Sequence, residues 1–161
     1  DRQKLHVTSV KKKLLAVKEL FWRITGHNNG SYCQDFFTHC IYPRCLVSTE
    51  DALFCAHFIN LMHSMSTPGF YTLDYFCTVT DAVVGALYCV TEDEARNLGL
   101  MVEQMWKLLG NWRYDERSYD AGLAGKPGAI YVKEDSATDE SKIESLSQEL
   151  SFTDFDSVYN R

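Results

Sequence analysis

The sequence predicts an all-α fold, built from five or six helices joined by short connectors. Apolar residues recur at steps of three and four in most segments, which is the spacing of one face of a helix. Ser48 and Thr91 each precede such a segment and have an acidic residue three positions later, a pattern typical of a helix N-terminus. Pro43 and Pro68 fall between segments, where a helix is expected to end. Helix pairs connected in this way form either a bundle or, since no internal repeat is visible, an irregular α-solenoid.

The first expected helix combines an apolar stripe with a cluster of lysines. Steps of three and four separate its apolar residues, which are Val7, Val10, Leu14, Val17, Phe21 and Ile24. The lysines gather largely off this stripe, at Lys11, Lys12, Lys13 and Lys18. Glycine and asparagine within residues 26–30 tolerate the left-handed backbone of a helix end, so the helix is expected to stop there.

A second, shorter helix is expected over residues 31–41. Pro43 disfavours helical backbone at the residue before it, so we expect Tyr42 to be extended and the helix to end. Arg44 follows, and its guanidinium is expected to hydrogen-bond carbonyls that the interrupted helix leaves free. Pro43 and Arg44 would then form a structural corner, with a second corner at Pro68.

Three longer helices follow. The third begins at Ser48 and closes before Pro68, and the fourth is expected over residues 72–90. β-Branched residues in the fourth segment leave a strand as the alternative, although a length of about 20 residues favours a helix. The fifth helix starts at Thr91. Its inner face is expected to hold Leu98, Met101, Val102, Met105 and Leu109.

Changes in composition divide the chain into three parts. Residues 1–119 form a helical scaffold region. Residues 120–150 are rich in Asp, Glu, Ser, Ala and Gly, so we expect an acidic low-complexity insertion, partly disordered, with a weak helix at 141–150. Residues 151–161 start a further helix. Because the chain stops within that helix, we expect it to be a fragment of a longer protein.

Composition and charge exclude several classes of protein. Apolar residues make up 45% and charged residues 24% of the chain, which is ordinary for a domain with a buried core. No apolar run reaches the roughly 18 residues that cross a bilayer, so no membrane partner is expected. The net charge of −6 is unlike that of a nucleic-acid-binding domain, yet residues 1–25 carry seven basic residues against two acidic ones. Lys11, Lys12, Lys13 and Lys18 are therefore candidate contacts for a partner or for RNA or DNA phosphates, with a solvated helix face as the alternative.

The sequence contains no recognisable set of catalytic or metal-binding side chains. Six cysteines lie in apolar segments, and we expect them to be reduced and buried. The cysteines and the histidine from Cys33 to Cys45 lack the close pairing of structural zinc ligands. Cys55 and His57 are two residues apart, which points them to different sides of a helix. We therefore expect no catalytic residue, no metal site, no cofactor and no enzymatic activity.

Several motifs resemble those of a known family. The first is CIYPRC at residues 40–45, followed by Ser48-x-x-Asp51-Ala52 and Phe54-Cys55-Ala56-His57-Phe58. Two more are Thr67-Pro68-x-Phe70-x-Thr72-Leu73 and Thr91-Glu92-Asp93-Glu94-Ala95 with Gly99. Together, over roughly residues 36–120, they resemble the family of THO complex subunit 2, the large nuclear scaffold of messenger-RNA packaging and export.

The resemblance implies an irregular, HEAT-like α-solenoid of antiparallel helices without enzymatic activity. It implies a nuclear scaffold of the THO/TREX complex, which couples transcription elongation to mRNA processing, mRNP assembly and mRNA export. The implied partners are other THO subunits and a DEAD-box RNA-dependent ATPase, an RNA helicase. RNA contact is implied mainly for regions outside this chain, and the acidic insertion departs from the family pattern. The alternative is a helical module that binds RNA or DNA directly through Lys11, Lys12 and Lys13.

Overall fold

The computed structural model describes residues 2–21, 29–132 and 147–159. Its helices in chain order are α1 (Arg2–Phe21), α2 (Asn29–Phe36), the π-helical turn η1 (Phe37–Ile41), α3 (Tyr42–Cys45), α4 (Thr49–Ser64), α5 (Thr72–Ala86), α6 (Glu92–Arg113), α7 (Glu116–Gly122), the 3-10 turn η2 (Pro127–Ala129) and α9 (Phe152–Tyr159). Two short strands, β1 (Ile130–Val132) and β2 (Ser147–Glu149), pair antiparallel. This part of the chain is mainly helical, as predicted, and the small sheet is a feature that the sequence analysis missed.

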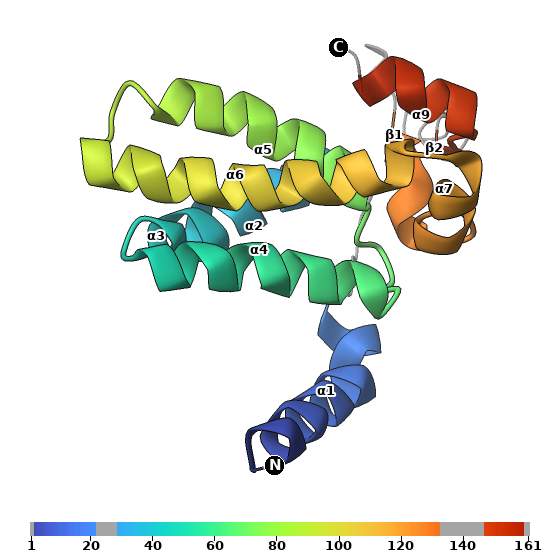
Figure 1. Cartoon of the computed structure of the whole chain (residues 1–161), viewed down its shortest axis with the longest axis horizontal. Coiled ribbons are helices and arrows are strands. Elements are labelled where there is room, and N and C mark those ends of the chain that lie inside the picture. The colour runs from blue at the N-terminus through green and yellow to red at the C-terminus, as the bar shows by residue number, and fades with distance from the viewer. Residues whose placement is uncertain (1, 22–28, 133–146, 160–161) are drawn as a thin grey trace.

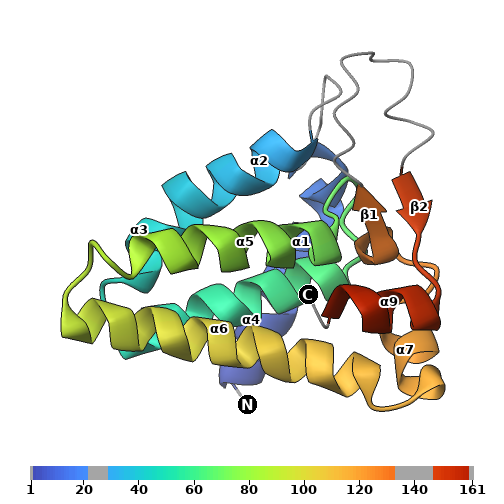
Figure 2. The same cartoon turned by 90° about the horizontal axis from the view of Figure 1, so that it is seen from above.

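Two helical hairpins make up the body of the molecule (Figures 1 and 2). One runs from α2 through η1 and α3 into α4, and the other runs from α5 into α6. Helix α2 lies against α5, and α4 lies against α6. Successive long helices reverse direction, so the two members of each contacting pair run the same way. The turns of both hairpins lie at one end of the body, and α7, α9 and the strands lie at the other.

The apolar faces of the third, fourth and fifth predicted helices meet in the core. Residues 72–86 are helical, which excludes the strand alternative, although α5 ends at Ala86 rather than near residue 90. On α6 the predicted inner face is buried except for Val102, which is half-buried. The core between the hairpins is formed by Phe37, Ile41, Cys45, Ala52, Cys55, Ile59, Met62, Leu73, Phe76, Val79, Leu98, Met101 and Met105.

The predicted end of the second helix at Tyr42 is wrong. Tyr42 has helical backbone angles, φ −56° and ψ −52°, and the chain passes through η1 directly into α3. The Tyr42 N–H donates to the Phe37 carbonyl, a bond to the fifth preceding residue that widens the helix by one residue. Pro43 therefore lies in the first turn of α3. Backbone N–H groups in a first turn have no partner within the helix, so the N–H that proline lacks costs no helical hydrogen bond. The π turn lets the chain accept the proline without leaving the helical conformation.

The prediction that Arg44 hydrogen-bonds free backbone carbonyls at the corner is also wrong. Its Nε donates to Asp51 Oδ1 at 2.9 Å, and its guanidinium lies 4.1 Å from the centre of the Phe54 ring. Arg44 thus joins α3 to the first turns of α4 by an ion pair and a cation–π contact, not by carbonyl contacts. A cysteine supplies the contact to a backbone carbonyl instead, since Cys55 Sγ donates to the Ile41 carbonyl at 3.7 Å.

Helix α1 projects away from the two hairpins (Figure 1). Its apolar stripe is mostly uncovered in the described structure: Val7 is 54% exposed and Val17 is 42% exposed. Leu14 and Lys18 are half-buried, and Lys18 Nζ donates to the Met65 carbonyl at 3.3 Å, just beyond the end of α4. The predicted helix end falls partly in residues 22–28, outside the described structure, while residues 29 and 30 begin α2 instead.

The C-terminal elements pack on the end of α6. Phe155 is buried, and its ring centre lies 5.4 Å from that of Tyr119 in α7. Arg113 Nε donates to Asp156 Oδ1 at 2.6 Å, which ties α9 to the last turn of α6. The prediction of a weak helix at 141–150 is wrong for residues 147–149, because these residues form the strand β2. In the described part of the chain, no helix combines the length and the apolar character that crossing a bilayer requires.

Candidate functional site

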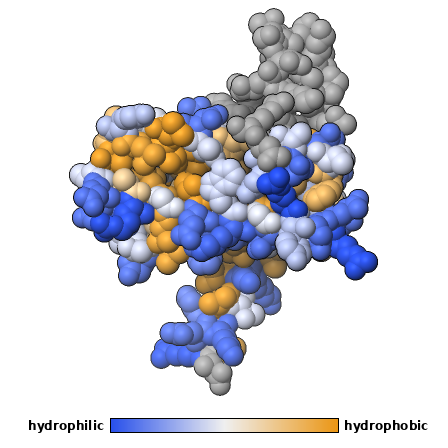
Figure 3. Space-filling view, turned by 45° about the horizontal axis from the view of Figure 1, so that its top comes forward, coloured by the Kyte–Doolittle hydropathy of each residue, from blue (hydrophilic) through white to orange (hydrophobic). Residues whose placement is uncertain are grey.

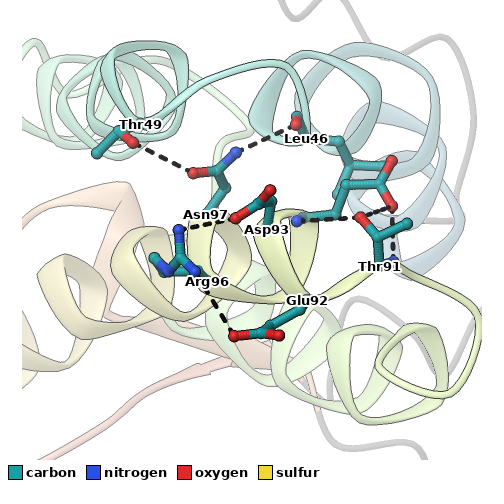
Figure 4. Close-up of polar contacts among 8 residues, drawn as sticks. Leu46, Thr49, Thr91, Glu92, Asp93, Arg96 and Asn97 are labelled. Atoms are coloured by element: carbon teal, nitrogen blue, oxygen red, sulfur yellow. Dashed lines mark hydrogen bonds and ion pairs between the residues drawn. The ribbon is translucent and has the colours of Figure 1, made fainter.

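The corner around CIYPRC is held to α6 by a buried asparagine (Figure 4). Asn97 Nδ2 donates to the Leu46 carbonyl at 3.1 Å, and Asn97 Oδ1 accepts from Thr49 Oγ1 at 3.4 Å. The Cys45 thiol donates to the Asn97 carbonyl at 3.7 Å. Because a buried amide is costly unless it is hydrogen-bonded, this arrangement fixes how the turn between α3 and α4 meets α6. The corner is thus a structural joint between the hairpins.

Both predicted helix starts are confirmed. Ser48 Oγ accepts the Asp51 N–H at 3.1 Å at the start of α4. At the start of α6, Glu94 Oε2 accepts the Thr91 N–H at 2.8 Å and Thr91 Oγ1 accepts the Glu94 N–H, which completes a capping box (Figure 4). The backbone hydrogen bond from Thr91 lowers the pKa of Glu94. Arg96 pairs with Asp93 at 2.8 Å, so the acidic run at this helix start has a structural role.

A second joint, centred on His63, connects the hairpins to the C-terminal elements. His63 Nε2 lies 2.8 Å from the Gly122 carbonyl, which can only accept, so Nε2 carries the proton. Nδ1 then accepts from Thr72 Oγ1 at 2.8 Å. The imidazole lies 4.7 Å from the Trp112 ring, centre to centre. Burial is the main cause that lowers the pKa of His63, and the positive charge of Lys126 lowers it further.

Two glycines let the backbone approach this joint. A Cβ on Gly122 would come within 2.4 Å of Trp112 Nε1. A Cβ on Gly128 would lie 2.6 Å from both His63 Nδ1 and Thr72 Oγ1. Only a residue without a side chain fits at either position with the neighbours as they stand. This joint was not predicted from the sequence, because no spacing rule connects residue 63 to residues 72, 122 and 128.

A cleft of about 550 Å³ lies beside the His63 joint. We call it the basic cleft. Its lining includes Lys11 from α1, Leu61 from α4, Leu108 and Trp112 from α6, and Lys126. None of the described residues that line it carries a carboxylate. Its position places one of the predicted lysines against the hairpins and adds Lys126, which the sequence analysis did not select.

The four candidate lysines of α1 have different surroundings. Lys11 lines the basic cleft, and Lys18 donates to the Met65 carbonyl. Lys12 and Lys13 are exposed. Pro68, the second predicted corner, is half-buried in the connection between α4 and α5, where Ser66 and Gly69 adopt positive φ. The structure therefore brings Lys11 and Lys126 to one cleft and leaves Lys12 and Lys13 on the outer surface.

The cysteines are only partly as expected. Cys33, Cys45 and Cys55 are buried, but Cys40 and Cys89 are exposed. Burial raises the pKa of Cys33 and Cys45 to about 12, so these thiols are protonated and unreactive near neutral pH. No group of three or more potential metal ligands occurs among residues 2–21, 29–132 and 147–159. The geometry of this part of the chain is that of polar joints and an open cleft.

Comparison with known proteins identifies the family. The sequence matches Tho2, described as "Transcription factor/nuclear export subunit protein 2", over residues 1–161. The chain belongs to the Tho2 family. The predicted resemblance of this chain to the family of THO complex subunit 2 is thereby confirmed.

Curated relatives of this Tho2 chain are much longer proteins. THO complex subunit 2 of Arabidopsis thaliana is 30% identical over 130 residues, which cover 80% of this chain and 7% of that protein. The Homo sapiens protein of the same name is 29% identical over 131 residues, or 81% of this chain and 8% of that protein. The Saccharomyces cerevisiae protein is 33% identical over 78 residues, or 48% of this chain and 5% of that protein. No solved structure gives a significant match to this chain.

The close approach at Gly128 predicts that Gly128→Ala destabilises this Tho2 segment. The added methyl group would displace His63 or Thr72, and overpacking of this kind costs about 1–3 kcal/mol. Gly99→Ala is the matched control, because its Cβ would meet nothing within 4 Å and it lies on the exposed face of α6. This control is expected to add about 0.5–1 kcal/mol. Urea unfolding monitored by circular dichroism measures both, and equal effects would contradict the role given to Gly128.

The lowered pKa of His63 predicts a loss of stability on acidification. The unfolded chain binds a proton on this imidazole at a higher pH than the folded chain does. The free energy of unfolding should therefore fall as the pH drops below the ordinary histidine pKa of about 6.5. His63→Gln should reduce the slope of the free energy of unfolding against pH between about pH 7.5 and 5.5. His57→Gln, at an exposed position on the same helix, should leave that slope unchanged. A slope that His63→Gln leaves unchanged would assign the effect to other groups.

Proposed function

We propose that this chain is a non-enzymatic scaffold segment of a nuclear THO/TREX complex, which couples transcription to mRNP assembly and mRNA export. The observation that carries this proposal is the presence of exposed apolar surfaces at both ends of a Tho2 helical segment. Uncovered apolar surface of this kind is typical of a site that another macromolecule covers. The partners we propose are other THO subunits and a DEAD-box RNA-dependent ATPase.

The helix arrangement supports a HEAT-like α-solenoid as the architecture of this segment. In a solenoid, successive helical hairpins stack so that equivalent helices lie side by side. The contacts of α2 with α5, and of α4 with α6, follow that scheme, since equivalent helices of the two hairpins run in the same direction. Stacking of this kind continues from hairpin to hairpin, so we propose that neighbouring segments of the longer protein extend it.

Two apolar surfaces support the docking role. The first is the stripe on α1, where Val10 is 39% exposed and Val17 is 42% exposed. The second lies where α5 ends, with Val84 58% exposed and Leu87 47% exposed. Figure 3 shows hydrophobic residues gathered at that end of the body, at the upper left, and others on α1 below it. Each surface offers a face against which a further helix could pack.

The proposal predicts that the chain captures purified THO subunits or the DEAD-box ATPase in a pull-down. Val10→Ser with Val17→Ser, or Val84→Ser with Leu87→Ser, should weaken capture of at least one partner by about tenfold, roughly 1.4 kcal/mol of lost apolar burial. Glu103→Ser with Lys107→Ser is the control, because it removes an exposed ion pair of α6 that contributes little. Capture of none of these proteins would contradict the scaffold proposal.

A second candidate function, direct RNA or DNA binding, is favoured by the charge of α1. Lys11, Lys12 and Lys13 are exposed on a helix that also carries Lys4, and exposed lysines bind phosphates through release of counterions. This function predicts salt-sensitive binding of an oligouridine that weakens strongly in a variant with all three lysines changed to Glu. Fluorescence anisotropy at two salt concentrations measures it. Absent binding, or binding that the triple variant retains, would remove this candidate.

A further inference from the structure

We propose that the basic cleft binds an acidic amphipathic segment of a partner protein. An apolar side chain of that segment would lie between Leu61 and Leu108, and its carboxylates would meet Lys11 and Lys126. This proposal rests on the scaffold function in that it names the chemistry of one docking partner. It adds a site that lies apart from the exposed apolar ends of the segment.

The shape of the cleft suits the insertion of a side chain. Its volume of about 550 Å³ falls within the roughly 300–1,000 Å³ typical of ligand pockets. Leu61 and Leu108 are half-buried and supply apolar surface from α4 and α6. Trp112 and His63, only 4% and 6% exposed, lie beneath them and are fixed by their own contacts. The floor is therefore preorganised, which lowers the entropy lost on binding.

The charges of the cleft select an anionic ligand. The chain as a whole has a net charge of −6, yet the described lining contains two lysines and no carboxylate. Lys126 Nζ already donates to the Gly122 carbonyl at 2.5 Å and to the Ala121 carbonyl at 3.3 Å. An ammonium has three donors, so one remains for a ligand carboxylate. Lys11 lines the same cleft from α1. One bound segment could therefore pair one carboxylate with Lys11 and another with Lys126.

The lining favours a protein segment over RNA. Single-stranded RNA is bound mainly by exposed aromatic faces, on which bases stack, and by a track of basic residues along the backbone. Trp112, the largest aromatic side chain of the lining, is covered, because its ring contacts His63 and stacks at 18° on Phe76. The exposed ring of the described lining is the imidazole of His57, and a single small ring is not a stacking platform for successive bases. Leucine walls instead complement an apolar side chain.

Fluorescence anisotropy with a designed peptide tests the proposal on the whole 161-residue chain. The probe is a fluorescein-labelled helical peptide of about 20 residues, with leucines on one face and glutamates on the other. Lys11→Glu with Lys126→Glu should weaken its binding by about tenfold or more. The matched control, Lys12→Glu with Lys13→Glu, makes the same change of charge on the outer surface of α1 and should change the affinity less than about twofold.

A charge swap and an RNA competitor decide between the outcomes. A second peptide with lysines in place of the glutamates should bind the Lys11→Glu, Lys126→Glu variant better than it binds the natural chain. That gain requires a folded cleft, so it distinguishes lost charge complementarity from unfolding. If both double variants lost affinity for the acidic peptide to the same extent, the proposal would be overturned. Oligouridine binding that depends on Lys11 and Lys126, with no peptide binding, would overturn it in favour of RNA. Capture of THO subunits in the pull-down is independent of either result.

Discussion

The His63 joint is the interaction on which the arrangement of the C-terminal half depends. One imidazole accepts from Thr72 on α5, donates to the end of α7 and packs against Trp112 on α6, so it connects four helices including its own. Gly122 and Gly128 permit this because any side chain there would occupy the same space. The ring is satisfied in its neutral form, and burial favours that form over the imidazolium ion.

The corner at α3 has a comparable role in the N-terminal half. The π turn carries the chain through Pro43 without breaking the helix, and Asn97 then binds the backbone of the turn that follows. The CIYPRC motif thus lies in a structural joint. That placement is consistent with a segment whose role is to hold its helices in a fixed arrangement and to present their outer surfaces.

Those outer surfaces differ in chemistry. The apolar ends, on α1 and at the end of α5, suit the packing of further helices. The basic cleft has leucine walls and carries two lysines, and these two features are the basis for the proposed ligand with both apolar and acidic groups. A scaffold that uses both kinds of surface can combine extended helical contacts with one selective contact, because charge contributes more to specificity than to affinity.

The sequence by itself determined the long helices α1, α4, α5 and α6, the capped starts of α4 and α6 and the buried face of α6, because these depend on local spacing and on side chains that bond within three residues. The motifs also determined the family. The path through Pro43, the partner of Arg44 and the exposure of the α1 stripe were decided only by the tertiary structure. So were the His63 joint and the meeting of Lys11 with Lys126 in one cleft. These depend on contacts between residues far apart in the chain, for which local propensity carries no information.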